Sequence, residues 1–116
     1  MQSLSSLPGK TLVNSVTERV QAGLPVLCDV PLCQLLLNPD PEELLNPVEE
    51  ELGRHAVVIV GVDLSRESLT IQNSWGDQWC DRGQGLLPLE FLKSPSRGTV
   101  WAVDVRRERG ATEGTR

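Results

Sequence analysis

Aromatic side chains are scarce in this chain. Its 116 residues include three Trp and one Phe, and there is no Tyr. The hydrophobic core must therefore be built from Leu, Val and Ile, and each Trp is expected to have a specific role. The length is that of one small domain, which buries roughly two-thirds of its unfolded surface and so has one modest core.

Basic residues are missing from the interval between Arg19 and Arg54. The net charge is −5, and the interval holds the acidic residues Asp29, Asp40, Glu42, Glu43, Glu49, Glu50 and Glu51. One interpretation is a solvated acidic loop at residues 31–54, since charge runs usually face water. The other is a rim that repels acidic substrates or attracts basic ones. An acidic balance without a basic stripe excludes a nucleic-acid partner.

Signals for export or membrane insertion are also missing. Met1 is followed by a polar segment with no apolar core, which excludes a signal peptide. No apolar run approaches the length that spans a bilayer. We therefore expect no membrane partner, and a cytoplasmic location if Met1 is the native start.

Motifs for metals and cofactors are equally scarce. Three cysteines at irregular spacing indicate neither a disulfide framework nor a zinc site. One histidine with scattered carboxylates makes no transition-metal site. The run Gly83-Gln84-Gly85 lacks the lysine or helix that a phosphate-binding loop requires. We expect no metal and no cofactor.

The first half of the chain predicts one helix and one strand. Apolar residues recur at helical spacing from Thr11 to Ala22, and Gly23 is a typical helix stop. A short β-rich run from Val26 to Val30 follows and ends at a proline. The segment from Leu32 to Glu51 contains three prolines and is expected to be a loop, with room for one helical turn at Glu42–Leu45.

The second half predicts antiparallel strands. His55 to Asp63 is nearly all β-branched or small apolar, which is typical of a central buried strand. Residues 64–67 form a polar hairpin connection, and Ser68 to Asn73 returns as the partner strand. Further strands are expected at residues 85–88 and 99–105, with a single turn at 89–92.

Glycines divide the region after Asn73 into turns. Gly76, Gly83 and Gly85 mark a stretch where we expect the backbone to adopt positive φ. The tail at residues 106–116 is charged and contains glycine, so it is predicted to be disordered.

These elements predict an α+β domain with an antiparallel half-barrel sheet and one N-terminal helix. The domain is expected to span residues 11–105, after an N-terminal segment at residues 1–10.

His55 and Asn73 are candidates for a catalytic pair. His55 begins one strand, Asn73 ends the next, and a hairpin between them brings the two ends together. Cysteine peptidases need such a pair: the histidine takes the thiol proton and later donates it to the leaving amine, while an amide fixes the tautomer of the ring. A solitary histidine beside an apolar strand is also a common structural residue, so the pair alone leaves both interpretations open.

Trp75 and Gly76 extend this pair into a motif. An indole two residues after Asn73 can cover a His–Asn hydrogen bond and exclude water. The chain reads Asn-Ser-Trp-Gly at 73–76, then Trp79, then glycines at 83 and 85, with His-Ala-Val at 55–57 before them. Residues 55–92 thereby resemble the C-terminal, β-rich domain of papain-like cysteine peptidases. The run in that family is Asn-Ser-Trp-Gly, two variable residues, Trp-Gly and a further glycine.

The resemblance implies roles for these residues but supplies no nucleophile. His55 would be the general base and acid, Asn73 its orienting partner, and Trp75 the shield, supported by Gly76. In the family the nucleophilic cysteine lies at a helix N-terminus of a preceding helical domain, which also carries an oxyanion-binding glutamine. Neither segment has a match in the 54 residues before His55. The nucleophile is therefore unknown.

None of the three cysteines is expected to replace it. Cys28 has Val26 and Val30 on the same strand face, which is typical of a buried small hydrophobe. Cys33 has no predicted helix start or cation beside it to activate a thiol. Cys80 occupies a position that is glycine in the family, and a cysteine there costs about 1 kcal/mol or more if the position requires positive φ.

Three functional hypotheses follow. The first is the His/Asn half of a papain-like peptidase that is inactive by itself, because its nucleophile would come either from a cysteine-bearing partner domain or from sequence missing from a truncated chain. Once complemented, it would act on peptide or protein substrates. The second is a non-catalytic pseudoenzyme or protein-interaction module that keeps the fold. The third is catalysis by one of this chain's own cysteines. A β-rich domain without its companion exposes an apolar face larger than the roughly 300–600 Å² usual on monomers, so we expect a partner or self-association.

Overall fold

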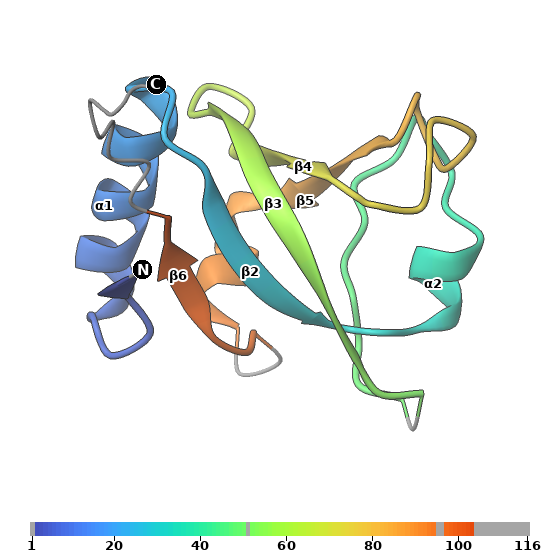
Figure 1. Cartoon of the computed structure of the whole chain (residues 1–116), viewed down its shortest axis with the longest axis horizontal. Helices are drawn as coiled ribbons and strands as arrows, with labels where there is room; N and C mark the ends of the chain where they lie inside the picture. Colours follow the sequence, from blue (N-terminus) through green and yellow to red (C-terminus); the bar gives the residue numbers. More distant parts are fainter. Residues whose placement is uncertain (1, 51, 95–96, 104–116) are drawn as a thin grey trace, which may run out of the picture.

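The chain folds into an open, six-stranded antiparallel sheet with one main helix (Figure 1). The computed structural model describes residues 2–50, 52–94 and 97–103. The strands are β1 (Gln2–Ser3), β2 (Val26–Pro31), β3 (Arg54–Asp63), β4 (Ser68–Gln72), β5 (Gln84–Pro88) and β6 (Val100–Ala102), and the helices are α1 (Gly9–Gln21), the four-residue α2 (Gln34–Leu37) and the 3₁₀ helix η1 (Leu89–Lys93). The sheet order is β1-β6-β2-β3-β4-β5. The predicted α+β class is confirmed.

Helix α1 packs its apolar stripe onto the sheet. Leu12 and Val16, four residues apart, are both buried, because this spacing places them on one helix face. Gly23 follows the helix with φ of +80°, the left-handed conformation that ends many helices. The predicted helix and its stop are confirmed, with the start two residues earlier than expected. In Figure 1, α1 and α2 lie at opposite ends of the molecule.

Strands β2 and β3 form the centre of the sheet, and only one of their faces is buried. Val26 pairs with Ile59 and Cys28 with Val57, and all four side chains belong to the hydrophobic core. The other face of β3 is open, since Ala56 and Val60 are exposed. The central position of this strand is confirmed, but the strand is buried on one face only, not throughout as the sequence predicted. α1, η1 and the segment after β2 supply buried residues to a single core.

A β-bulge at Val60 keeps the later residues of β3 in phase with the core. Ile59 pairs with Ile71 of β4, whereas the next pair is Gly61 with Thr70, so Val60 has no partner in the ladder. The extra residue shifts the alternation by one, and Val62 then packs against the core opposite Leu69.

The segment between β2 and β3, residues 32–53, differs from the prediction in one respect. The expected helical turn at Glu42–Leu45 is absent, and the helical turn forms instead in α2. Leu44 makes an isolated parallel bridge with Leu86, and the N–H of Leu45 donates to the carbonyl of Leu86 at 2.6 Å. Pairing with β5 therefore holds these two residues in extended backbone.

The remaining elements follow the predicted order. The hairpin turn at residues 64–67 joins β3 to β4, and the predicted strand and turn at residues 85–92 correspond to β5 and η1. The last strand is shorter than predicted and ends at Ala102; the tail at 106–116 lies outside the described residues. The sequence predicted no strand at β1, which pairs with β6 through Ser3 and Trp101. No helix among the described residues is long and apolar enough to cross a membrane.

Candidate functional site

Strand register brings His55 and Asn73 together. His55 lies opposite Val30 of β2, and it shares the core-facing side of β3 with Val57 and Ile59. Ile59 pairs with Ile71 of β4, so Asn73, two residues later, lies on the same side near the start of β3. The Nε2 of His55 and the Oδ1 of Asn73 are 2.8 Å apart.

This contact determines which ring nitrogen carries the proton. A carboxamide oxygen only accepts, so Nε2–H of His55 donates and the lone pair of the neutral ring is on Nδ1. Asn73 is 3% exposed, and its backbone N–H donates to the carbonyl of Gly83 at 2.9 Å. Its Nδ2 is buried and has no hydrogen-bond partner among the described residues.

Trp75 covers the imidazole. Its ring stacks on that of His55 with centroids 4.5 Å apart and planes at 21°. The indole is 38% exposed, so one face contacts the histidine while part of the ring meets solvent. Gly76 has φ of +94°, as expected, and its carbonyl accepts from the N–H of Trp79 at 3.3 Å. The turn that places Trp75 therefore depends on a glycine.

Trp79 is the part of the site whose role the sequence did not indicate. Its ring is 7% exposed and meets Trp75 edge to face, with centroids 6.1 Å apart and planes at 83°. Its indole N–H donates to the carbonyl of Leu36 in α2 at 2.7 Å. The motif spacing pointed to this tryptophan, but nothing in the sequence pointed to its acceptor 43 positions earlier.

Gly85 serves close packing. A Cβ at Gly85 would lie 2.9 Å from Leu45 Cδ1 and 3.0 Å from Trp79 Cη2. The expected positive φ is found at Gly76 and Gly83 but not at Gly85, so that part of the prediction is wrong. The strand conformation of β5 explains the difference, because extended backbone has negative φ.

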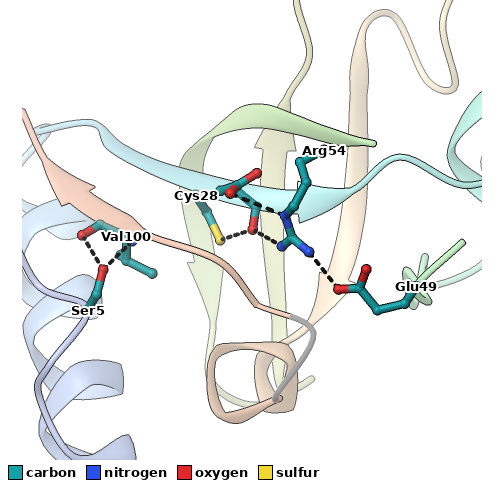
Figure 2. A network of polar contacts seen from close by, with 6 residues as sticks. Ser5, Cys28, Glu49, Arg54 and Val100 are labelled. Atoms are coloured by element: carbon teal, nitrogen blue, oxygen red, sulfur yellow. Dashed lines mark hydrogen bonds and ion pairs between the residues drawn. The ribbon is translucent and has the colours of Figure 1, made fainter. Parts of the chain in front are cut away.

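Next to His55, Arg54 binds two carboxylates of the acidic interval (Figure 2). Its Nε lies 3.2 Å from Asp29 Oδ2 and its Nη1 lies 2.6 Å from Glu49 Oε2. Burial works to lower the pKa of Arg54, but the hydrogen bonds and charges of Glu49 and Asp29 outweigh it and raise the pKa. The interpretation as a solvated loop named no partner for these carboxylates. The strand register provides one for Asp29, because Arg54 pairs with Pro31, two residues after Asp29.

Other carboxylates of this interval also have partners within the chain. Glu50 Oε1 accepts from the N–H of Gln34 at 3.2 Å, and Asp40 Oδ1 accepts from the N–H of Glu42 at 3.0 Å. These contacts favour a structural role for the acidic residues over a rim for basic ligands. Among the described residues, no three His, Cys, Asp or Glu side chains are grouped to hold a metal ion.

Cys28 and Cys33 are buried in the core. Cys28 is 1% exposed, and burial raises the pKa of its thiol to about 12, so the nucleophilic thiolate does not form near neutral pH. Cys33 is fully buried. The expectation that no helix starts beside Cys33 is wrong, because α2 begins at Gln34. This helix has four residues, and its start does not make the thiol accessible.

Cys80 has the strained backbone that the sequence suggested. Its φ is +52°, a conformation that favours glycine. Burial raises the pKa of its thiol, and the charges of Asp81 and Asp40 act in the same direction. All three cysteines are unbridged. None of them has the features of an activated nucleophile.

Comparison with solved structures relates this fold to a cysteine protease. The chain is similar to xylellain, a cysteine protease from Xylella fastidiosa, with a TM-score of 0.60 and 20% sequence identity. The match covers 81% of this chain and 37% of the xylellain chain. No protein-family profile and no curated protein sequence matches the chain. At this identity the similarity shows the fold alone: the chain folds like part of that protease.

Proposed function

We propose that this chain is the His/Asn half of a papain-like cysteine peptidase, with His55 as general base and acid and Asn73 as its orienting residue. The observation that carries the proposal is the 2.8 Å contact between His55 Nε2 and Asn73 Oδ1 beneath the stacked Trp75 ring. The substrate class is a peptide or protein, and the nucleophile comes from a separate domain.

The tautomer suits this chemistry. With Nε2–H held by Asn73, the lone pair on Nδ1 of His55 accepts the proton of a thiol placed beside it. The thiolate attacks the peptide carbonyl, and the imidazolium returns the proton to the leaving amine. Water then hydrolyses the thioester, with His55 again as the base. Trp75 lowers the local dielectric around the His–Asn bond, which strengthens it.

The unpaired amide nitrogen of Asn73 supports a functional role. A buried donor without an acceptor costs about 1–3 kcal/mol, and most buried polar atoms in folded proteins are paired. The orientation of this amide satisfies His55 and leaves its own Nδ2 unpaired. A side chain serving stability alone would gain from a fully paired arrangement.

The open face of the sheet offers a surface for the partner. Trp101, Leu27 and Val58 are consecutive cross-strand partners and so share this face, next to the exposed Val60. The match covers only 37% of the xylellain chain, so the related protease has a large further part that this chain does not match. We infer that the occupant of this face is a protein domain with an apolar surface; the face lies on the opposite side of β3 from His55, so the thiol reaches the imidazole from a different surface.

A second function is favoured by a different observation. Cys80 keeps a strained φ of +52° at a position where the family has glycine, and the described cysteines are buried or half-buried. A non-catalytic interaction module would tolerate these features. In that case replacing His55 with Ala leaves partner binding unchanged and no reactive thiol is found in the complex. Catalysis by Cys28, Cys33 or Cys80 is disfavoured by their burial.

The test uses a thiol probe on the complemented chain. Tagged chain is used to capture its partner from extracts of the source organism, and the complex is treated with an epoxide probe for activated cysteines. The proposal predicts labelling of a partner cysteine that is lost with His55→Ala and kept with Ser74→Ala, an exposed site next to Asn73. Labelling that is absent, or equal with His55→Ala, rejects the peptidase proposal.

A further inference from the structure

Trp79 joins the segment between β2 and β3 to the histidine. Its indole N–H donates to the carbonyl of Leu36 at 2.7 Å inside the core, where no water competes for the bond. A buried N–H that loses its acceptor is strongly destabilising, because it has neither a protein nor a water partner. The orientation of the Trp79 ring is therefore fixed by the position of α2.

The Trp79 ring is also confined from the side of the sheet. Because Gly85 has no Cβ, the Trp79 ring can pack directly against its backbone, where a Cβ would collide with the ring. The side chain of Leu45 packs against the same point. A ring held by one hydrogen bond and by close packing has little freedom to rotate. Trp79 is thus a rigid surface for its neighbours.

Trp75 packs against the Trp79 ring. Its indole is 38% exposed, and its ring contacts are with Trp79 at 6.1 Å and His55 at 4.5 Å. A half-exposed ring has several rotamers of similar energy unless packing selects one. The edge of Trp79 selects the rotamer in which Trp75 covers the imidazole.

The acceptor of the hydrogen bond is itself held in place. The N–H of Leu32 donates to the carbonyl of Gly53 at 2.9 Å, which closes the segment at its two ends. The N–H of Gln34, at the start of α2, donates to Glu50 Oε1 at 3.2 Å. These contacts position α2, and with it the carbonyl of Leu36.

We propose that Trp79 is a positioning residue for His55: through the Leu36–Trp79–Trp75 contacts, the 32–53 segment sets the orientation and tautomer of the imidazole. The catalytic consequence rests on the proposed function. The positioning itself does not, because it is a property of the folded chain and is measured without peptidase activity.

The experiment uses the fact that the chain has a single histidine. Nitrogen-15 NMR of the imidazole reports which ring nitrogen carries the proton, and ring-current shifts of its protons report the stacked indole. Trp79→Phe keeps an aromatic ring but removes the N–H donor. Trp101→Phe, on the open face of the sheet, is the matched control.

The proposal predicts a folded Trp79→Phe protein in which the Nε2–H tautomer loses population and the His55 protons lose part of their ring-current shift. Trp101→Phe leaves both signals as in the unchanged chain, and Trp75→Phe alters them at least as much as Trp79→Phe. A folded Trp79→Phe protein with unchanged His55 signals overturns the proposal. Absence of peptidase activity does not affect this readout, so the two proposals fail separately.

A second measurement applies if Trp79→Phe does not fold. In the unchanged chain, exchange of the Trp79 indole N–H and the ring-current shift of the His55 protons are followed at denaturant concentrations below global unfolding. Positioning predicts that the ring-current shift is lost in the same step in which the indole N–H becomes exchangeable. A ring-current shift that persists after the indole N–H exchanges freely contradicts it.

Discussion

The Trp75 ring lies over the His55 imidazole, stacked at 4.5 Å with a 21° angle between the planes. The same imidazole donates from its Nε2 edge to Asn73. One face and one edge of the ring are therefore held by Trp75 and Asn73, which are two positions apart in the chain. The other nitrogen, Nδ1, is left to accept a proton. An arrangement of this kind orients a base before any substrate or nucleophile arrives.

Replacing Asn73 with Ala tests the cost of the His–Asn contact. Asn73 is buried, and its loss leaves Nε2–H of His55 without its acceptor, but it also removes the unpaired Nδ2, which offsets part of the loss. We therefore expect the free energy of unfolding to fall by about 1 kcal/mol. Urea unfolding followed by circular dichroism measures it. Ser74→Ala, at the exposed neighbouring position, is expected to cost clearly less. Equal losses for the two variants would show that the buried contact adds nothing to stability.

Cys80 offers a test of backbone strain. Its φ of +52° suits glycine, whereas alanine has the same steric conflict as cysteine. We expect Cys80→Gly to be more stable than Cys80→Ala by about 1 kcal/mol, which corresponds to a few degrees in the melting temperature of a domain this size. Thermal unfolding of the two variants gives the comparison. A less stable glycine variant would mean that chain entropy outweighs the strain.

Gly85 tests the close packing around Trp79. Alanine there places a Cβ 2.9 Å from Leu45 and 3.0 Å from Trp79, and we expect a loss of about 1–3 kcal/mol from overpacking. The matched control is Gly9→Ala, whose nearest atoms belong to the flexible side chain of Lys93. Chemical denaturation of both variants checks the prediction. A Gly85→Ala protein as stable as Gly9→Ala would show that the core yields without cost.

The buried thiol of Cys28 is expected to make the protein less stable at alkaline pH. Its pKa in the folded state is about 12, raised by burial from the ordinary 9.0, so the unfolded thiol ionises first as pH rises. Ionisation of the unfolded state alone stabilises that state, and the free energy of unfolding falls through the window from about pH 9 to 12, by up to about 1.4 kcal/mol per pH unit. Unfolding of the unchanged chain and of Cys28→Ala at pH 7 and pH 10 isolates this term. The stability difference between them should shrink or reverse at pH 10, and a constant difference contradicts the prediction.

Patterns within short stretches of sequence predicted most of the fold. The helical spacing from Thr11, the β-branched run after His55 and the glycine after Asn73-Ser74-Trp75 each correspond to an element that the structure contains. These signals are local, because a helix stripe, a strand or a tight turn depends on residues a few positions apart. The candidate pair His55 and Asn73 could be predicted from the sequence for the same reason, because a single hairpin connects their strands.

Contacts between distant segments were not predictable in this way. The bulge at Val60, the donation of Trp79 to the carbonyl of Leu36 and the binding of Asp29 by Arg54 all depend on which backbone atoms packing brings together. The prediction of a helical turn at Glu42–Leu45 failed for this reason, because pairing with β5 overrode a weak local preference.

The amino-acid order thus decided the elements, the hairpin and the chemical identity of the histidine–amide–indole set. The folded arrangement alone decided that the amide oxygen meets Nε2, that one sheet face stays open, and that α2 holds Trp79. Propensity acts over a few bonds, whereas the atoms in each of these contacts are placed by register and by the filling of a shared core.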